Sequence, residues 1–451
     1  MHLPNSQGSN GQSVDAMLQG VAIDVARVLG KALDGGELTI DETVLLFRTT
    51  GAELEATAKT ADELRNRAVG DLVTYVVNRN INFTNVCIKR CGFCAFSRDF
   101  RQEEGYLLPT EEIVRRAKEA WDLGATEVCI QAGLPPQMEG DLYIKLTRAL
   151  KEALPELHIH GFSPEEVLYG AVRSRASIRE YLRELKEAGV GSLPGTSAEI
   201  LDQDLRDLIS PGRIRVDQWI DVITTAHELG IPTTSTIMYG HVEDEVHKAR
   251  HLALIRDLQK TTGGFTEFVP LSFIHTEAPM FTHGTVPTVR SGASHEEVIK
   301  MHAVARIVLN NWIPNLQVSW VKEGLPTSQL LLTAGVNDMG GTLMNESIST
   351  AAGAPFGQLV APVTFRRLIR DAGRVPAERH TTYRIRRVFT EEEDAAASDS
   401  LDEMGPDSEE RLGSYQRLIK MEEFRYQHPR RKAVALASTS SKSGKPTKDV
   451  Q

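Results

Sequence analysis

Cysteine is scarce in this chain, with four residues among 451. A disulfide framework needs an even set of cysteines spread through a small secreted domain, so a chain of this length argues against one. No run approaches the roughly 18 consecutive apolar residues of a membrane span. Basic residues number 51 against 61 acidic ones, for a formal charge of −10, and a general nucleic-acid binder needs a basic footprint. We therefore expect no nucleic-acid partner and no membrane.

The first residues also lack a targeting signature. They read MHLPNSQGSNGQS, with neither the basic and apolar regions of a secretory signal nor the arginines of a transit peptide. We expect a disordered leader over residues 1–14 and a reducing, cytoplasmic setting.

Hydrophobic spacing then divides the chain. Apolar residues recur every three to four positions over residues 14–33 and 60–77, which predicts an N-terminal helical segment over 15–68. From residue 69 to 390, short β-rich runs alternate with amphipathic helices. The β-rich runs are INFTNVC, EVCIQAG, LHIHGF, GSLPG, IPTTSTIMYG, FTEFVPLSFI and NLQVSWV, with an eighth near Met339–Met344. This alternation is typical of parallel βα units and favours an α/β fold of the (β/α) TIM-barrel type, with its active site at the carboxyl ends of the strands.

The composition changes again after residue 390. Residues 391–410 contain ten acidic side chains and no lysine or arginine, so the rest of the chain balances at 51 acidic to 51 basic residues. A short basic patch and a Ser/Lys-rich end follow. We expect a mostly disordered acidic and basic tail over 391–451.

Three of the four cysteines crowd into CIKRCGFC. Cys87, Cys91 and Cys94 follow the first β-rich run, and this spacing presents three thiolates on one tight loop. Three cysteine ligands leave one iron of a [4Fe–4S] cluster without a protein ligand, and an open position suits catalysis. The amino and carboxylate groups of S-adenosylmethionine (SAM) fit that position. The alternatives are a three-cysteine Zn site completed by His, or buried thiols. Cys129 lies in the second β-rich run and reads as a core residue.

CIKRCGFC resembles the signature of radical SAM enzymes, and the resemblance implies a (β/α) barrel with a [4Fe–4S] cluster and SAM as cofactors. It also implies that the backbone at Gln131 and Gly133 contacts the SAM amino group, although Leu134 stands where the family has an acidic residue. His160, which shares a strand face with His158, and Ser163 contact SAM or substrate under this interpretation. Their alternative is a polar core role.

The next two β-rich runs carry further candidates. Thr196 and Glu199 lie where a strand meets a helix, and a carboxylate there can hold the SAM ribose. The alternative is a helix cap, with Thr196 or Ser197 as the N-cap and Glu199 in the first turn. Met238 and Glu243 occupy places that close the adenine side in radical SAM enzymes, and Tyr239 is a catalytic candidate.

Polar residues at the last strand ends suit a hydrogen-bond-rich substrate, although each type also makes plain turns. The catalytic candidates among them are His275, Asn337 and Asp338, and other polar residues there are Glu267, Gln317, Ser319, Lys322, Asn345 and Glu346.

From about residue 65 to 390 the chain is similar to the second subunit of FO synthase. The motifs that carry this resemblance include HIHGFSPEEV, TTSTIMYGHVE, GGFTEFVPLSFIH and NDMGGTLMNESIS. The family implies a transferase that cleaves the Cα–Cβ bond of L-tyrosine and adds the 4-hydroxybenzyl group to 5-amino-6-(D-ribitylamino)uracil, in the biosynthesis of the deazaflavin FO and coenzyme F-420. It also implies an external electron donor and a separate ring-closing radical SAM subunit, because this chain has only one CxxxCxxC.

Two other interpretations stay open. Aminofutalosine synthase and cyclic dehypoxanthine futalosine synthase of menaquinone synthesis share much of this skeleton but act on other substrates. A Zn-dependent scaffold that is not an enzyme is the third, and a colourless protein rather than a brown one would distinguish it.

The cysteine assignment predicts that the anaerobically reconstituted protein binds one [4Fe–4S] cluster and that Cys91→Ser abolishes turnover, because a cluster with two protein ligands is poorly held. Iron content and product formation measure this. Full turnover in the Cys91→Ser variant would refute the assignment.

Overall fold

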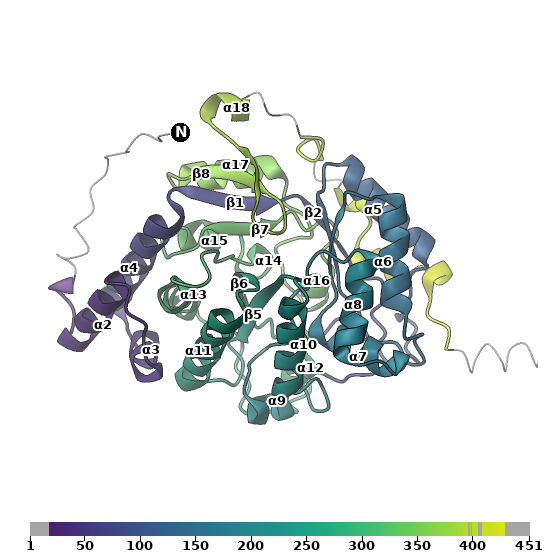
Figure 1. Ribbon diagram of the computed structural model, residues 1–451, viewed down its shortest axis with the longest axis horizontal. Coiled ribbons are helices and arrows are strands. Elements are labelled where there is room, and N and C mark those ends of the chain that lie inside the picture. Colours follow the sequence, from purple (N-terminus) through teal and green to yellow (C-terminus); the bar gives the residue numbers. More distant parts are fainter. Residues whose placement is uncertain (1–17, 396, 398, 405–407, 429–451) are drawn as a thin grey trace, which may run out of the picture.

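The computed structural model describes residues 18–395, 397, 399–404 and 408–428 (Figure 1). The expected leader at 1–14 lies outside the described residues, and so does the 429–451 part of the expected tail.

Three helices form the N-terminal segment: α2 (Ile23–Leu33), α3 (Ile40–Phe47) and α4 (Gly51–Val69). Thr39 begins α3 with a capping box, since its hydroxyl accepts from the Glu42 amide at 3.2 Å while the Glu42 carboxylate accepts from the Thr39 amide at 2.9 Å. In Figure 1 these helices lie together on one side of the molecule, where α3 and α4 pack against α13 (His295–Leu309) and α3 also packs against α11 (Glu245–Thr262).

The helical spacing of residues 60–77 continues past the helix itself, whereas the predicted segment 15–68 ends within one residue of the end of α4. Gly70, with φ of 66°, ends α4, and the following LVTYV run forms the first strand, β1 (Leu72–Val76), which was not predicted. Its β-branched and apolar residues are buried almost continuously, as in a strand covered on both faces. The first strand therefore begins about ten residues before the predicted INFTNVC run.

Nine strands form three sheets among the described residues. They are β1 (Leu72–Val76), β2 (Asn78–Ile81), β3 (Glu127–Ile130), β4 (His158–Gly161), β5 (Thr233–Tyr239), β6 (Phe265–Ser272), β7 (Asp338–Gly341), β8 (Val375–Arg379) and β9 (Ile385–Val388). The sheet orders are β7-β1-β8-β9, β2-β3-β4 and β5-β6, and every pairing is parallel except that of β8 with β9. The sequence analysis did not predict β8 or β9.

Two predicted strands are reduced to isolated bridges. In GSLPG, Ser192 bridges to His160 and Leu193 to Thr233; in NLQVSWV, Leu316 bridges to Phe268 and Gln317 to Asp338. All these bridges are parallel. GSLPG therefore lies between β4 and β5, and NLQVSWV lies between β6 and β7, where strands were expected.

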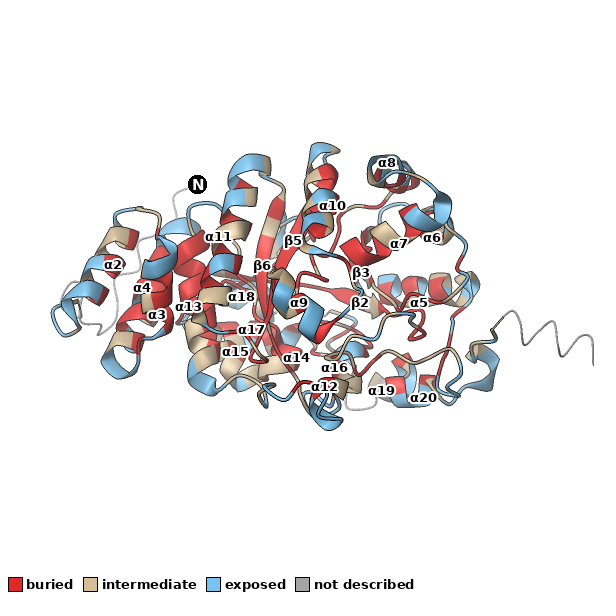
Figure 2. Cartoon of the chain, turned by 90° about the horizontal axis from the view of Figure 1, so that it is seen from below, coloured by how far each residue is buried: buried red, intermediate tan, exposed pale blue. Residues whose placement is uncertain are grey.

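Helices connect the strands, as expected for βα units. The longer ones are α5 (Thr110–Asp122), α6 (Leu142–Ala153), α7 (Pro164–Ser174), α8 (Ile178–Ala188), α10 (Val216–Glu228), α11, α13 and α17 (Pro362–Asp371). The shorter ones are α9 (Gln203–Ile209), α12 (Pro279–Thr282), α14 (Trp320–Glu323), α15 (Leu325–Leu331) and α16 (Ile348–Ala351). Helix α8 buries Tyr181, Leu182 and Leu185 on one face. Figure 2 shows the same pattern, with buried strands inside and exposed outer helix faces. Among the described residues, no helix has the length and apolar character to cross a membrane.

The expectation of a disordered tail is wrong for the part of 391–428 that the structure describes. It contains α18 (Glu391–Ala395), α19 (Ser408–Leu412), α20 (Tyr415–Leu418) and a 3-10 turn (Glu422–Phe424). The Arg366 guanidinium, 1% exposed, binds Asp394 at 2.5 Å, Asp399 at 2.8 Å and Asp402 at 2.7 Å. These three acidic residues are therefore held by Arg366 on α17, which lies outside residues 391–410.

Replacing Arg366 should destabilise the fold, because three carboxylates then share a partly buried site without their cation. We expect Arg366→Met to lower the free energy of unfolding by about 3 kcal/mol, measured by chemical denaturation. The exposed neighbour Arg367 is the matched control, and Arg367→Met should change it by less than about 0.5 kcal/mol. Equal effects of the two substitutions would contradict the pairing.

Candidate active site

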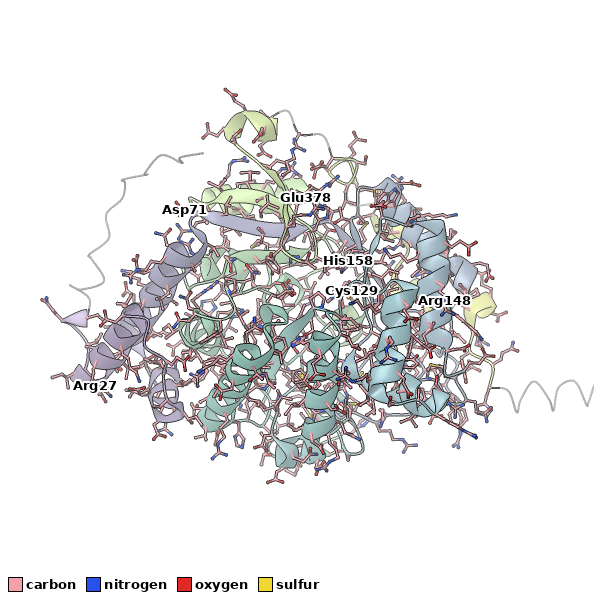
Figure 3. All side chains as sticks on the ribbon, in the orientation of Figure 1. Arg27, Asp71, Cys129, Arg148, His158 and Glu378 are labelled. Carbon is pink, nitrogen blue, oxygen red and sulfur yellow. The ribbon has the colours of Figure 1, made fainter. Side chains whose placement is uncertain are left out.

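One cavity of about 390 Å³ gathers side chains from most strands and from the loops after them. Fifteen of the residues that the sequence analysis named for the site line it: Cys87, Cys91, Cys94, Gln131, Gly133, His160, Ser163, Thr196, Glu199, Met238, Glu267, Gln317, Ser319, Lys322 and Glu346. They come from segments more than 150 residues apart. Figure 3 labels Cys129 and His158 on two neighbouring strands of the interior, whereas Arg148 lies on an outer helix.

Backbone contacts fix the loop that carries the three cysteines. The Cys87 amide donates to the Arg98 carbonyl at 3.1 Å, and the Cys94 amide donates to the Cys91 carbonyl at 3.2 Å. Between them, the Gly92 amide donates to Ile209 O at 2.8 Å, and a Cβ on Gly92 would come within 2.9 Å of Met280 Cβ. Only glycine fits there without displacing its neighbour.

The three thiols are half-buried and line the same cavity. Burial raises the pKa of Cys91 to about 12 and also raises the pKa of Cys87, although the Arg213 cation opposes both shifts. Iron binds thiolates, so cluster binding would release protons from these thiols. Three sulfur donors on one loop that lines one cavity fit the donor set of a three-cysteine cluster site. Within the described ranges, no three His, Cys, Asp or Glu side chains are placed to hold a single metal ion.

Arg213 links the cysteines to the carboxylates, and sequence reasoning missed it. Its guanidinium binds Glu199 at 2.7 Å and donates to the Ser197 hydroxyl at 2.9 Å. It lies 3.5 Å from Glu165 and 5.2 Å from the Phe93 ring centre. Arg213 lies in the loop before α10, and no motif marked it. Because a buried ion pair needs all its partners, Arg213 also fixes the position of Glu199.

The segment Gln131–Gly133 lies tightly against the cysteine loop. The Gly133 amide donates to Thr84 O at 2.8 Å, and a Cβ on Gly133 would come within 2.4 Å of Val86 O. The Gln131 side chain accepts a hydrogen bond from the Thr196 hydroxyl at 2.8 Å. The alternative in which Thr196 or Ser197 caps a helix is wrong, because α9 begins later, with Asp202 as its cap.

Ser163 begins α7 and binds Glu166, a residue the sequence analysis did not single out. The Ser163 hydroxyl donates to the Glu166 carboxylate at 2.6 Å, and the Ala132 amide donates to the other oxygen at 3.0 Å. Burial raises the pKa of Glu166 to about 7 in spite of these hydrogen bonds. Glu166 also lines the cavity, so the capping box that Ser163 and Glu166 form at the start of α7 is part of the site.

His160 and His158 share one face of β4, as expected from their spacing. Both imidazoles bind the Ser192 hydroxyl, His160 at 2.7 Å and His158 at 2.8 Å. Burial works against ionisation of the neighbouring Glu127, but His160 and hydrogen bonds from Thr381 and Asn78 hold its pKa below the ordinary value. Cys129, expected in the core, lines the cavity on the adjacent strand.

A second ion-pair group lies around Arg379 on β8. Its guanidinium binds both oxygens of Asp338, at 2.5 and 3.0 Å, and lies 3.5 Å from Glu267. Arg379 and Glu267 line the cavity, whereas Asp338 lies behind them. Burial raises the pKa of Glu267 to about 7. Arg379 was missed because β8 was not predicted.

The remaining candidates lie outside the cavity lining, and their functional roles stay predictions. Glu243 accepts hydrogen bonds from the amides of Gly240 at 2.7 Å and His241 at 2.9 Å, and Tyr239 donates to Glu323 at 3.3 Å. The Asn337 side chain accepts from the Leu316 amide and from Arg306, Asp338 pairs with Arg379, and the His275 ring contacts Phe281.

Comparisons with known proteins agree with this geometry. Residues 81–255 match the family model of the radical SAM superfamily, and residues 262–392 match that of the CofH/MqnC C-terminal region. The chain is 46% identical to the 5-amino-6-(D-ribitylamino)uracil–L-tyrosine 4-hydroxyphenyl transferase of Methanothermobacter thermautotrophicus, over 79% of this chain and 96% of that protein. It is 44% identical to FO synthase of Mycobacterium leprae, over 82% of this chain but 43% of that protein.

The fold is similar to that of a solved structure. The FeFe-hydrogenase maturase HydG from Carboxydothermus hydrogenoformans superposes with a TM-score of 0.62 at 15% identity, covering 94% of this chain and 95% of that one. At this identity the likeness concerns the fold alone.

The raised pKa of Glu166 predicts a pH dependence of stability. Because the folded state binds this proton more tightly, its stabilising contribution is full below the ordinary pKa of 4.5 and is lost as the pH rises to about 7. In iron-free protein, we expect the unfolding free energy of the wild type to fall over this range by up to about 3 kcal/mol relative to Glu166→Gln. The exposed Glu152→Gln variant on α6 is the control and should follow the wild type. Parallel pH curves for wild type and Glu166→Gln would contradict the assignment.

Proposed function

The chain belongs to the radical SAM superfamily, in the branch that carries the CofH/MqnC C-terminal region, and on this premise we propose that it is a 5-amino-6-(D-ribitylamino)uracil–L-tyrosine 4-hydroxyphenyl transferase. The observation that carries the proposal is the 46% identity to such an enzyme over 96% of that enzyme's length. In the proposed reaction the Cα–Cβ bond of L-tyrosine breaks, the 4-hydroxybenzyl group adds to the diaminouracil, and 2-iminoacetate, methionine and 5′-deoxyadenosine are released.

The family implies a [4Fe–4S] cluster and SAM. Cys87, Cys91 and Cys94 would hold the cluster, and the chemistry it would supply when bound is one-electron cleavage of SAM to methionine and a 5′-deoxyadenosyl radical. The backbone at Gln131 and Gly133 lies beside the cysteine loop, where the SAM amino group would bind.

In the segment of Thr196, which hydrogen-bonds Gln131, Glu199 is held by Arg213 and would bind the SAM ribose through its carboxylate. Met238 contributes an apolar surface to the same wall, and its amide donates to Glu199 O at 2.7 Å. These contacts support one binding surface formed by two neighbouring strand ends. Many of the residues that line the cavity are buried, which would limit the access of water to a reactive radical.

The deeper part of the cavity is suited to the two substrates. Its polar groups include Glu127, His160, Glu267 and Arg379, which supply donors and acceptors to a uracil ring and a ribityl chain. We propose that His160 binds substrate rather than SAM, because it lies on β4 beside Glu127 and not on the cysteine loop.

We also infer that the three sheets form one closed (β/α) barrel. Parallel bridges at Ser192 and Leu193 join β4 to β5, and those at Leu316 and Gln317 join β6 to β7. Strands β1 and β2, consecutive in the chain, pair with β7 and β3. This order supports a ring of parallel strands around the cavity.

Two partners follow from the proposal. The chain spans 43% of the length of the M. leprae FO synthase, so that protein carries a further region of comparable size. We propose that a separate radical SAM subunit closes the deazaflavin ring and that an external donor reduces the cluster. The cytoplasmic setting expected from the sequence is kept as part of this proposal.

A menaquinone-pathway enzyme is the second candidate, because the matched C-terminal region is shared by the CofH and MqnC branches. Anaerobic incubation with SAM and either L-tyrosine plus 5-amino-6-(D-ribitylamino)uracil or the menaquinone-branch substrates separates the two. We expect a hydroxybenzyl adduct of the diaminouracil by mass spectrometry, and none of it with Cys91→Ser. Turnover with only the menaquinone-branch substrates would overturn the proposal in favour of the second candidate.

A further inference from the structure

Four basic side chains line the cavity: Lys89, Arg213, Lys322 and Arg379. Three of them are neutralised by the protein. Lys89 lies 3.2 Å from Glu165, Arg213 lies 2.7 Å from Glu199, and Arg379 binds both oxygens of Asp338. Lys322 differs, since it has no ion pair and no side-chain hydrogen bond with any residue in the described part of the chain.

The carboxylates nearest to Lys322 are already engaged. Glu346 accepts hydrogen bonds from the backbone amides at the start of α16, the closest at 2.9 Å. Glu323 accepts from Tyr239 at 3.3 Å, and Glu199 is paired with Arg213. These groups attract Lys322 through space, but none lies within the 4.0 Å of an ion pair. Burial accordingly lowers the pKa of Lys322.

The position of Lys322 is fixed by its neighbours on α14. Trp320 is 1% exposed, and its indole N–H donates to Gly341 O at 2.8 Å, which ties α14 to β7. Val321 is buried and lines the cavity beside Lys322. Lys322 itself is half-buried. An ammonium fixed by packed neighbours in a partly desolvated cavity, without a protein anion, is favoured when a ligand supplies the negative charge.

We propose that Lys322 binds the α-carboxylate of the amino-acid substrate. This inference rests on the proposed function, because L-tyrosine carries the only carboxylate of the two substrates, and the ribityl uracil is neutral. The SAM carboxylate is expected at the open iron beside Cys87, Cys91 and Cys94. That leaves the tyrosine carboxylate as the anion without a partner and Lys322 as the cation without one.

The cavity wall beside Lys322 suits the rest of the same substrate. Val269, Leu271 and Phe273 on and after β6, together with Leu343, provide apolar surface for a phenol ring. Lys322 is thus a specificity residue that selects an amino acid over the corresponding amine, because a charge-assisted hydrogen bond to a desolvated ammonium has no equivalent in the amine.

The test compares L-tyrosine with tyramine, which lacks the carboxylate, on the cluster-loaded enzyme with SAM. In the wild type, the inhibition constant of tyramine should be at least about 10-fold higher than the KM for tyrosine. In Lys322→Met, the KM for tyrosine should rise about 10- to 100-fold while the inhibition constant of tyramine stays within about 3-fold, so the discrimination disappears. Lys322→Arg keeps the charge and should restore part of it. The exposed Lys118→Met on α5 is the matched control and should behave as the wild type.

Iron content, visible spectrum and SAM affinity are measured on each variant as readouts of an intact site. Full discrimination in Lys322→Met would overturn the proposal, and so would a loss of SAM affinity with unchanged discrimination, which would place the SAM carboxylate on Lys322. If Lys322→Met fails to load its cluster, tyrosine and tyramine are compared on Lys322→Gln and Lys322→Arg instead. Unchanged discrimination between tyrosine and tyramine in Lys322→Gln would then overturn the proposal. Absence of the hydroxybenzyl product in the wild type would instead refute the proposed function.

Discussion

The pairing of buried charges is the constraint on which the site depends. The cavity collects carboxylates, guanidinium groups and thiols away from water, and an ionised group in such a place needs a partner or a shifted pKa. Arg213 pairs with Glu165 and Glu199 beside the cysteine loop, and Arg379 pairs with Asp338 and lies 3.5 Å from Glu267 on β6. Where burial outweighs the nearby cations, as at Glu166 and Glu267, the pKa of the carboxyl rises to about 7.

The surrounding fold keeps these pairs in place. Strands β2, β3 and β4 are in register, and this register sets Cys129 beside His160. Ser192, in the segment that bridges to β4, binds both His158 and His160. The described part of the C-terminal segment adds a second layer of support. The ring of Tyr415 packs 5.6 Å from that of Phe96, just after the cysteine loop, and the Leu107 amide donates to Phe424 O at 2.8 Å. The C-terminal residues thus support the loop that carries the thiols, although they lie outside both matched family regions.

The sequence predicts the parts of this arrangement that depend on short spacing. CIKRCGFC predicts three thiols on one loop, and the two-residue step from His158 to His160 predicts a shared strand face. In the structure the thiols line one cavity, and both imidazoles bind the Ser192 hydroxyl. The strand formed by LVTYV was not predicted, because its apolar residues continue the helical spacing of the segment before it. Arg213 and Arg379 could not be found in this way, because their partners lie 14 or more residues away and only the fold brings them together. The acidic residues of 391–410 were expected to be disordered because the cation that pairs with them, Arg366, lies on α17 and is brought close only by the fold.

The central claim is that one cavity holds the cluster, SAM and tyrosine together. The most direct measurement is the crystal structure of the anaerobically reconstituted protein grown with SAM and L-tyrosine. The account predicts a [4Fe–4S] cluster on Cys87, Cys91 and Cys94, SAM between Gln131 and Glu199, and tyrosine in the deeper part of the same cavity. Iron density on other residues, or tyrosine bound outside this cavity, would contradict it.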